Sequence, residues 1–478
     1  MSTSTTPGSP GRPQPSDVAP EERPPRRNAR YTPVDADGPL PHQMVAAVPR
    51  IRADPLAFLA SVQARHGDLA AFPMPRLPVV LVSSPTAARR VLVDNHRGWS
   101  KRTAQYGALS AVTGSGLLTS DGEVWRERRR TAQPAFHPRG LESVADESVA
   151  AARRMRAAWP TWGGVVDVDA GGLQATLEVV GRTLFGADVA QDGERLVTAV
   201  LEALEVVVGR VRTPLPAWLP TPARRRLRRA VQELDEASAA LVARRRARGT
   251  SPDDEDLLAL LLRAVDAGDL APHGLRDELV TMVIAGHETV ASALTWTLHL
   301  LAGNPSAQAR VAEELDEVLG GPDDRGGRSP AWGDLRSLVR TRAAVEESLR
   351  LFPPAWVVSR RALAEDVLDG VTVPAGTTAV ISPWLLHRRP ELFPEPEAYR
   401  PERFEVGLDR AARAAYLPFG AGPRLCIGRD FALVETTLLV AELLRGSTVR
   451  PAPGERVHVD ALVTMRPRGG LRLRVDPR

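Results

Sequence analysis

The sequence contains one cysteine, Cys426, in 478 residues. It therefore cannot form an internal disulfide, and it cannot supply a zinc or iron–sulfur site that needs two thiolates. Lysine is equally scarce, because Lys101 is the only one, so arginine carries nearly all of the positive charge. A chain so poor in cysteine suits a reducing compartment, and we expect a cytoplasmic protein.

A concentrated block of basic charge is also missing. The formal net charge is +4, and the arginine runs at 224–229 and 244–248 alternate with acidic stretches. We interpret these runs as solvated helix faces and expect no nucleic-acid partner. The apolar run 279–301 is long enough to span a membrane. However, His287 and Glu288 lie at its middle and Gly303-Asn304-Pro305 ends it. It therefore predicts a buried helix with a functional interruption and no membrane anchor.

The domain organisation follows from where large apolar residues begin. Residues 1–30 are rich in Pro, Ser and Arg and predict a disordered tail. Residues 31–478 show no internal linker and predict one domain, mainly α with small β-sheets. We expect strands at 68–72 and 78–82, a helix opening at Ser84-Pro85, and a strand-like stretch at 371–382 with a turn at 374–377.

The most informative segment runs from Phe419 to Gly428 and holds Cys426 just before a predicted amphipathic helix. A helix N-terminus and Arg424 both favour a thiolate there. Gly422 and Gly428 would let backbone amides approach the sulfur. Residue chemistry leaves three interpretations open: a buried structural cysteine, a nucleophile lacking a nearby histidine base, and a metal-bound thiolate.

The spacing Phe-x-x-Gly-x-Arg-x-Cys-x-Gly is longer and more specific than the cysteine alone. Phe419, Gly422, Arg424, Cys426 and Gly428 occupy every fixed position. This pattern resembles the haem-ligand signature of the cytochrome P-450 family. The resemblance implies the P-450 fold, haem b as the cofactor, Cys426 as the axial ligand of its iron, and the other four residues around the cofactor.

Two polar motifs flanking a Pro-Pro stop extend the resemblance. Glu347 and Arg350 are three apart on one predicted helix face and can pair. Such pairs are common on surface helices and carry little weight alone. Arg403 follows in a Pro-Glu-Arg-Phe segment. The resemblance implies a structural role, with Glu347 held between Arg350 and Arg403.

The interruption of the central helix matches a third motif of the family. Ala285 and Thr289 are four apart and share a helix face. The resemblance implies that Ala285 leaves room for dioxygen and that Glu288 and Thr289 form an acid–alcohol pair guiding protons. Val290 stands where the family often has a second threonine, which leaves that pair intact. We expect His287 to make a local hydrogen bond.

A fourth motif is the pair Trp125 and Arg129, four apart on one predicted helix face. A guanidinium and an indole N–H suit carboxylates, and the resemblance implies that both bind haem propionates. Arg360 is a further propionate candidate, although sequence does not separate it from Arg361. The neighbouring arginines are interpreted as a solvated face: Arg126, Arg128 and Arg130.

The resemblance, which covers the chain from about residue 40, implies a monooxygenase that activates dioxygen. Electrons would come from NAD(P)H through a separate ferredoxin and ferredoxin reductase. An acidic ferredoxin would dock where Arg126, Arg128 and Arg429 are presented. We expect a monomer.

A lipophilic substrate is predicted: a terpenoid, polyketide, fatty acid or similar secondary metabolite. The resemblance places 106–118 and 206–219 over the distal side of the pocket. Its lining is expected to include Met282, Val283, Trp356 and Val357. Two other functions stay open: a peroxide-using peroxygenase, and a non-enzymatic haem-based sensor or carrier.

Overall fold

The computed structural model describes residues 32–74, 77–159, 163–186, 199, 202–203, 206, 221–249, 251, 254–322 and 326–478. The predicted tail at 1–30 lies outside these residues, and so does segment 207–219 of the expected pocket cover. The described chain is mainly helical with small sheets, which confirms the predicted fold class.

The described helices follow the chain in three groups. The first group is α1 (Pro41–Ala53), α2 (Pro55–His66), α3 (Pro85–Arg89), α4 (Ala104–Thr113), α5 (Gly122–Ala132), α6 (Leu141–Ala157) and α7 (Val168–Leu184). The second is α9 (Pro222–Arg248), α10 (Leu257–Asp266), α11 (Pro272–Val283), α12 (Thr289–Gly303), α13 (Pro305–Leu319) and α14 (Val339–Leu351). The last is α15 (Pro383–Leu386), α16 (Glu402–Glu405), α17 (Arg410–Ala415) and α18 (Arg429–Leu444).

Several helices begin with the same local signal, a side-chain oxygen followed by proline. Asp54, Ser84 and Thr221 each accept a hydrogen bond from a backbone N–H in the first turn of α2, α3 and α9. The proline at the next position has no N–H to leave unsatisfied and is preset to helical φ. The predicted start at Ser84-Pro85 is therefore confirmed.

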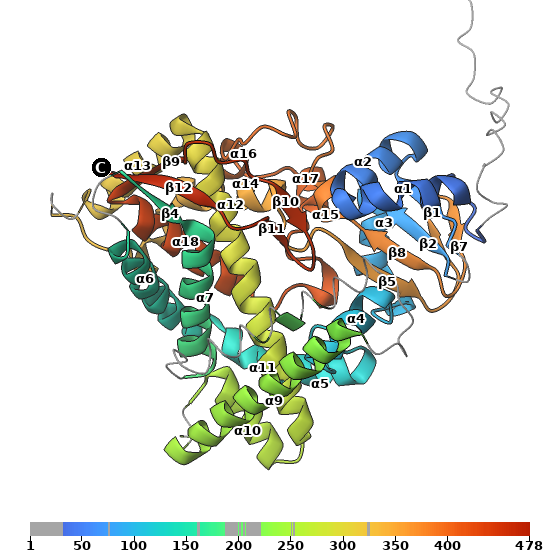
Figure 1. Cartoon of the computed structure of the whole chain (residues 1–478), viewed down its shortest axis with the longest axis horizontal. Coiled ribbons are helices and arrows are strands. Elements are labelled where there is room, and N and C mark those ends of the chain that lie inside the picture. The colour runs from blue at the N-terminus through green and yellow to red at the C-terminus, as the bar shows by residue number, and fades with distance from the viewer. Residues whose placement is uncertain are drawn as a thin grey trace, which may run out of the picture.

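The largest sheet has the order β1-β2-β8-β5-β3. Its strands are β1 (Leu69–Phe72), β2 (Val79–Val82), β8 (Thr378–Ile381), β5 (Val358–Ala362) and β3 (Trp99–Ser100). The predicted strands at 68–72 and 78–82 are thus present within a residue, and they pair antiparallel. Figure 1 shows this sheet with α1 and α2 at one end of the molecule and most of the long helices at the other.

The stretch predicted as one strand-like unit at 371–382 divides between two sheets. β7 (Val371–Val373) pairs with β6 (Asp366–Leu368), whereas β8 pairs with β2 and β5. The turn at 374–377 separates them, with Gly376 at φ +84. The remaining strands form two further sheets: β4 (Gly164–Asp167), β9 (Ser447–Pro451) and β12 (Arg472–Pro477) in one, β10 (Val459–Ala461) and β11 (Met465–Pro467) in the other.

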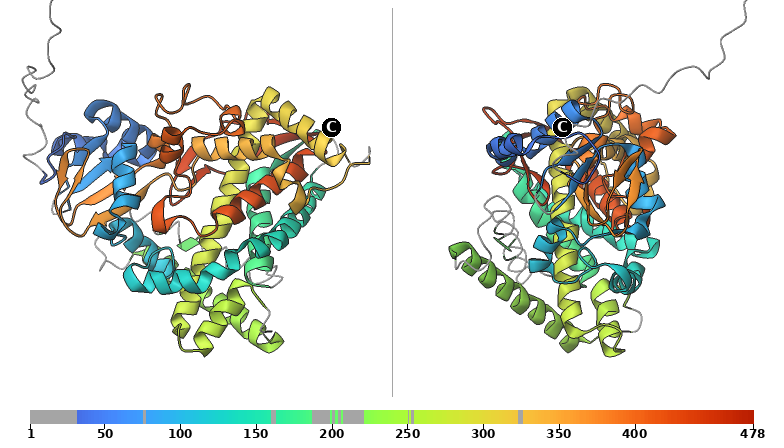
Figure 2. Two further views of the ribbon diagram at one scale, coloured as in Figure 1. Left: turned by 180° about the vertical axis from the view of Figure 1, so that it is seen from behind. Right: turned by 90° about the vertical axis from the view of Figure 1, so that its right-hand side faces the viewer.

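The run predicted to be an interrupted buried helix consists of α11, the π-helical turn η5 (Ile284–Glu288) and α12. All three views place this central helix through the middle of the molecule (Figures 1 and 2). A π-turn inside an α-helix often marks a functional site. None of the described helices has both the length and the apolar character needed to cross a membrane.

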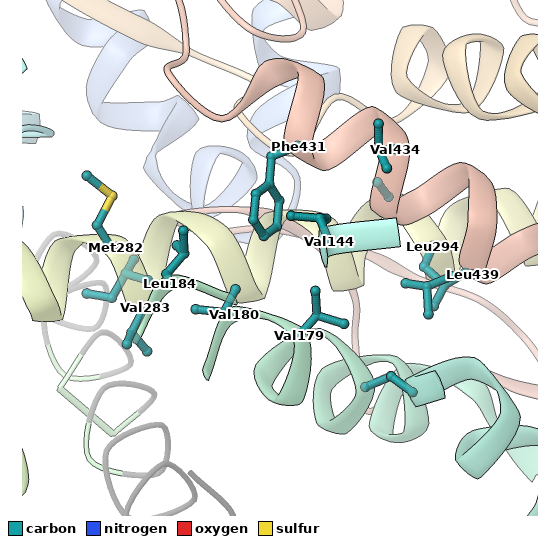
Figure 3. Close-up of a cluster of buried hydrophobic side chains, with 14 of the residues drawn as sticks. Val144, Val179, Val180, Leu184, Met282, Val283, Leu294, Phe431, Val434 and Leu439 are labelled. Atoms are coloured by element: carbon teal, nitrogen blue, oxygen red, sulfur yellow. The ribbon is translucent and has the colours of Figure 1, made fainter. Parts of the chain in front are cut away.

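The core joins the central helix to α6, α7 and α18 (Figure 3). Val144, Val180, Leu294 and Leu439 contribute to it from these four helices. The helix after the cysteine was predicted to be amphipathic, and this is wrong, because α18 is buried along its whole length from Leu433 to Leu444. It packs against α6, α12 and α14 together, so beyond its exposed first residues, Arg429 and Asp430, it has no face left for solvent.

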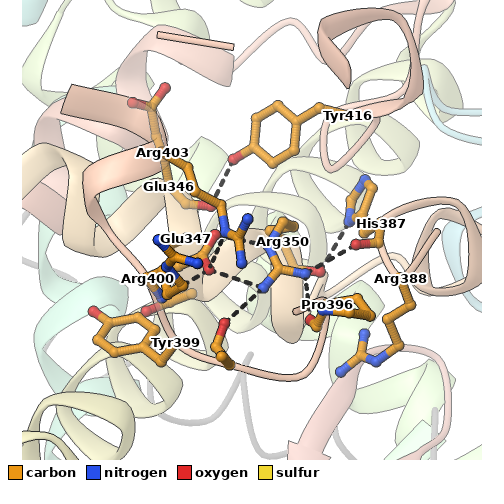
Figure 4. Close-up of polar contacts among 12 residues, drawn as sticks. Glu346, Glu347, Arg350, His387, Arg388, Pro396, Tyr399, Arg400, Arg403 and Tyr416 are labelled. Atoms are coloured by element: carbon orange, nitrogen blue, oxygen red, sulfur yellow. Dashed lines mark hydrogen bonds and ion pairs between the residues drawn. The ribbon is translucent and has the colours of Figure 1, made fainter. Parts of the chain in front are cut away.

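A buried ion pair connects α14 to the chain that follows it (Figure 4). Glu347 and Arg350 are both fully buried and pair at 2.7 Å and 2.8 Å through two parallel contacts. Arg403 reaches the same carboxylate at 3.4 Å. Arg350 also donates to the carbonyls of His387 and Pro396. The sequence-derived triad is therefore brought together, and it ties α14 to segment 387–403.

Breaking this pair should destabilise the fold strongly. Glu347→Gln leaves the Arg350 charge buried without its carboxylate, and we expect unfolding to become easier by about 3–5 kcal/mol. Glu395→Gln is the matched control, since Glu395 pairs with Arg400 on the surface, where such pairs are worth about 0–1 kcal/mol. Urea unfolding measures both variants, and equal losses would contradict the account.

Candidate active site

The loop that holds Cys426 is closed by its own backbone. The N–H of Cys426 donates to Phe419 O at 2.9 Å, and the N–H of Leu425 donates to Gly422 O at 3.0 Å. Gly422 has φ +69, and a Cβ there would lie 2.2 Å from the carbonyl oxygen of Leu92. Gly422 therefore lets the loop pack closely against η1 (Arg90–Asp94), while the backbone N–H that bonds the sulfur is that of Gly428.

The side chain of Cys426 is accessible to solvent, although protein surrounds it closely. Burial raises the pKa of its thiol, and this outweighs the Gly428 N–H bond to the sulfur and the charges of Arg129, Lys101 and Arg429, which lower it. The helix N-terminus and Arg424 were expected to favour a thiolate, and burial opposes that tendency in the protein chain by itself. A thiolate here needs a further positive partner, such as a metal ion.

A cluster of cations lies beside this loop. Arg424 places its guanidinium 3.8 Å from the ring centre of Trp125 and donates to Ser120 O and Asp121. Arg129 donates to Leu425 O at 2.7 Å. Arg360 is buried and contacts the hydroxyl of Tyr106 at 3.3 Å. Its neighbour Arg361 is exposed, so the structure brings Arg360 to the cluster and leaves Arg361 out.

Sequence reasoning missed one member of this cluster, Lys101. It is buried, and its ammonium group donates to Leu118 O at 2.8 Å. Burial, together with the charges of Arg360 and Arg424, lowers its pKa well below the usual value. The signal available in the sequence was scarcity: Lys101 is the only lysine in the chain. With Trp125, Arg360 and Arg424 it lines a cleft of about 520 Å³.

Between Asp277 and Leu298 the central helix is accessible at one place. From Asp277 to Leu298 its residues are buried except Ala285, Gly286 and Thr289, which are partly accessible. These three positions include the i and i+4 pair and so share one face. The Thr289 hydroxyl donates to Ala285 O at 2.6 Å. Small side chains and a hydroxyl thus border the opening.

The two polar side chains of the π-turn are buried. Burial raises the pKa of Glu288, whose Oε1 accepts a hydrogen bond from Thr464 at 2.7 Å. Burial lowers the pKa of His287 to about 4, and its neutral ring donates from Nε2 to Leu173 O at 2.9 Å. His287 therefore makes a hydrogen bond as expected, but the bond is not local, because its partner lies on α7, 114 positions earlier in the chain.

The four predicted pocket residues lie in two different places. Met282 and Val283 are buried in the core cluster of Figure 3, near Leu184. Trp356 donates to Leu462 O at 3.0 Å, and the carbonyl of Val357 accepts from Gln105 at 3.4 Å. The structure does not bring the two pairs together in a single described cavity.

One cation that the sequence predicted to lie on the surface is buried instead. Arg128 is buried, with Nε 3.6 Å from Oε1 of Glu278, whose pKa burial raises to about 7. It therefore holds α5 against α11 instead of facing a partner. Arg126 and Arg429 are exposed as predicted.

These residues fit a haem with a thiolate ligand. A porphyrin with two propionates would supply anions to the cations around the cleft. Among the described residues, the carboxylate that acts on Lys101 and Arg424 is that of Asp121. An iron ion offers the accessible Cys426 sulfur the positive partner that it needs. Lys101, Arg129, Arg360 and Arg424 would hold the propionates.

Comparisons with known proteins agree with this class of site. The family model described as Cytochrome P-450 matches residues 37–469. Cyclooctat-9-en-7-ol 5-monooxygenase of Streptomyces melanosporofaciens is 38% identical and covers 91% of this chain and 92% of its own. Pentalenene oxygenase of Streptomyces avermitilis is 35% identical, with 89% and 93% covered. The crystal structure of CYP175A1 from Thermus thermophilus is 34% identical, with a TM-score of 0.73 and 91% and 97% covered.

The fold and site thus define a haem-thiolate enzyme. The chain belongs to the cytochrome P-450 family and is a monooxygenase, which uses a thiolate-bound haem and dioxygen.

Adding one methyl group at the cysteine loop tests the packing described for it. Gly422→Ala should lower stability and haem content, because the new Cβ meets Leu92 O and overpacking adds about 1–3 kcal/mol to the backbone strain. Gly420→Ala is the matched control, since Gly420 has φ +72 with nothing within 4 Å of a Cβ. Thermal unfolding and haem absorbance report both effects, and the same loss in the two variants would refute the steric argument.

Proposed function

We propose that this monooxygenase hydroxylates a lipophilic terpenoid with electrons from a separate ferredoxin and its reductase, and ultimately from NAD(P)H. The observation that carries the proposal is the single opening of the central helix, at Ala285, Gly286 and Thr289, next to a buried acid. The catalytic assignments are Cys426 as the axial ligand and Glu288 with Thr289 as the proton-handling pair.

The haem, when bound, supplies the iron centre that activates dioxygen. The chain's own part is to hold protons and exclude water. Burial raises the pKa of Glu288, which favours a protonated carboxyl able to give up its proton. The Thr289 hydroxyl, now donating to Ala285 O, is the adjacent group that can pass a proton toward the opening. His287 is neutral and already donates its Nε2–H to Leu173 O, so it takes no part in proton transfer.

The terpenoid assignment rests on chemistry shared with relatives. Two relatives of 35–38% identity are named for oxygenation of pentalenene and of an unsaturated alcohol, cyclooctat-9-en-7-ol. Two of the three accessible residues at the opening, Ala285 and Gly286, carry no polar side chain, which suits a substrate with few polar groups. An apolar surface also withholds water from the reacting carbon.

The partner assignment rests on exposed positive charge near the cysteine loop. Arg126 pairs with Glu123 and Arg429 pairs with Asp430, all on the surface. Such surface pairs are worth about 0–1 kcal/mol, so an acidic protein can displace the carboxylates. Complementary charge would then speed the encounter.

Reconstitution with a [2Fe–2S] ferredoxin, its reductase and NADPH tests the proposal. We expect a sesquiterpene or diterpene substrate to shift the haem absorbance on binding and to yield a hydroxylated product, whereas fatty acids and polyketides do not. Turnover should fall as ionic strength rises. Faster turnover with hydrogen peroxide and no partner would instead indicate a peroxygenase, and binding confined to the other substrate classes would overturn the terpenoid assignment.

A further inference from the structure

The hairpin of β10 and β11 is fastened to the central helix by its backbone. The carbonyl of Met465 accepts hydrogen bonds from Ser292 at 2.6 Å and from Trp296 at 3.0 Å, two residues of α12. Ser292, Trp296 and Met465 are all buried. The hairpin tip, residues 462–464, is therefore fixed beside the turn where η5 passes into α12.

The tip reaches the acid of the π-turn directly. Thr464 donates to Oε1 of Glu288 at 2.7 Å, and both side chains are buried. The other oxygen, Oε2, is buried and has no hydrogen-bond partner among the described residues. A carboxyl with one oxygen held and one bare has a defined rotation, and its proton belongs on the bare oxygen.

The next strand brings a charge to the same place. Arg466 on β11 pairs with Asp169 of α7 at 2.8 Å, while its other terminal nitrogen lies 3.8 Å from Oε1 of Glu288. Asp169 is buried and also accepts from Thr295 at 3.3 Å. Asp169 thus draws Arg466 toward itself and away from full pairing with Glu288.

We propose that Thr464 and Arg466 are positioning residues for Glu288, and that Asp169 regulates how strongly Arg466 acts on it. This inference rests on the proton role given to Glu288 above. The hairpin then orients the acid from outside the central helix, so that a side chain 176 positions later in the chain fixes which oxygen carries the proton.

The same tip also contacts the segment after α14. Leu462 O accepts from Trp356 at 3.0 Å, two residues before Thr464. Residue 356 is one of the expected pocket positions. Trp356 is therefore hydrogen-bonded to the same loop that presents Thr464 to Glu288.

The groups around Glu288 shift its pKa in opposite directions. The Thr464 hydrogen bond and the charge of Arg466 lower the pKa of Glu288, whereas the charge of Asp169 and burial raise it. Removing Thr464 or Arg466 should therefore raise that pKa, and removing the charge of Asp169 should lower it. A change in burial alone would not raise the pKa of Glu288 in two of these variants and lower it in the third.

An infrared pH titration of the ferric holoenzyme measures this carboxyl without turnover. The protonated C=O band that disappears in Glu288→Gln identifies the group. We expect its midpoint to rise by about one pH unit in Thr464→Val and Arg466→Gln, and to fall in Asp169→Asn. Thr464→Ser should restore the wild-type midpoint because it keeps the hydroxyl.

The matched control for Arg466→Gln is Arg468→Gln, which removes a charge from the same part of the chain. Arg468 is exposed and lies 3.6 Å from Asp460, so this variant should leave the midpoint unchanged. In the same preparations, Thr464→Val should release severalfold more peroxide per NADPH than wild type, with substrate binding and the carbon monoxide spectrum intact.

Unshifted midpoints in Thr464→Val, Arg466→Gln and Asp169→Asn would overturn the positioning proposal. A shifted midpoint in Thr464→Ser would also overturn it, because the hydroxyl group would then not be what positions Glu288. Full coupling in Glu288→Gln would instead refute the proton role in the proposed function. The two results are distinguishable because the band shifts are read without catalysis.

Discussion

Positive charge buried beside one sulfur is the constraint on which the rest of the structure depends. Lys101 and Arg360 lie in the interior, and Arg129 and Arg424 are half-buried. Each has a carbonyl, ring or hydroxyl as a neighbour, yet among the described residues the carboxylate that contacts this group is that of Asp121. Desolvated cations are costly without counter-charge. A cofactor that brings two carboxylates and a metal ion satisfies both the cations and the thiol.

The central helix contributes the complementary feature. It is buried from Asp277 to Leu298 except at Ala285 and Gly286 of its π-turn and at Thr289 just after the turn, and these positions carry small or hydroxyl side chains. Burial acts in opposite directions on its two polar residues: it lowers the pKa of His287 to about 4, which keeps the ring neutral, and it raises the pKa of Glu288. The same low-dielectric environment therefore removes one group from proton transfer and prepares the other.

Local sequence signals predicted much of the fold and part of the site. Ser84-Pro85 marked the start of α3, two short apolar runs marked β1 and β2, and the spacing around Cys426 marked the loop. What could not be predicted depends on tertiary packing. Arg128 was taken for a surface cation because nothing in its neighbourhood reveals Glu278, about 150 residues later. The burial of α18 on every side likewise depends on three helices distant in sequence.

The desolvation of the thiol could not be predicted from the sequence for the same physical reason. A helix N-terminus and a nearby arginine are visible in the sequence, but the desolvation that raises the pKa of Cys426 is set by the whole interior. Lys101 and Thr464 were missed because each acts on a group far away in the chain.

The central claim, that Cys426 binds the haem iron as a thiolate, has one direct test. The reduced holoenzyme with carbon monoxide should show the long-wavelength Soret band of thiolate ligation, and Cys426→Ser should lose it. Wild-type protein with an imidazole-type spectrum, or a Cys426→Ser variant with an unchanged band, would contradict the account.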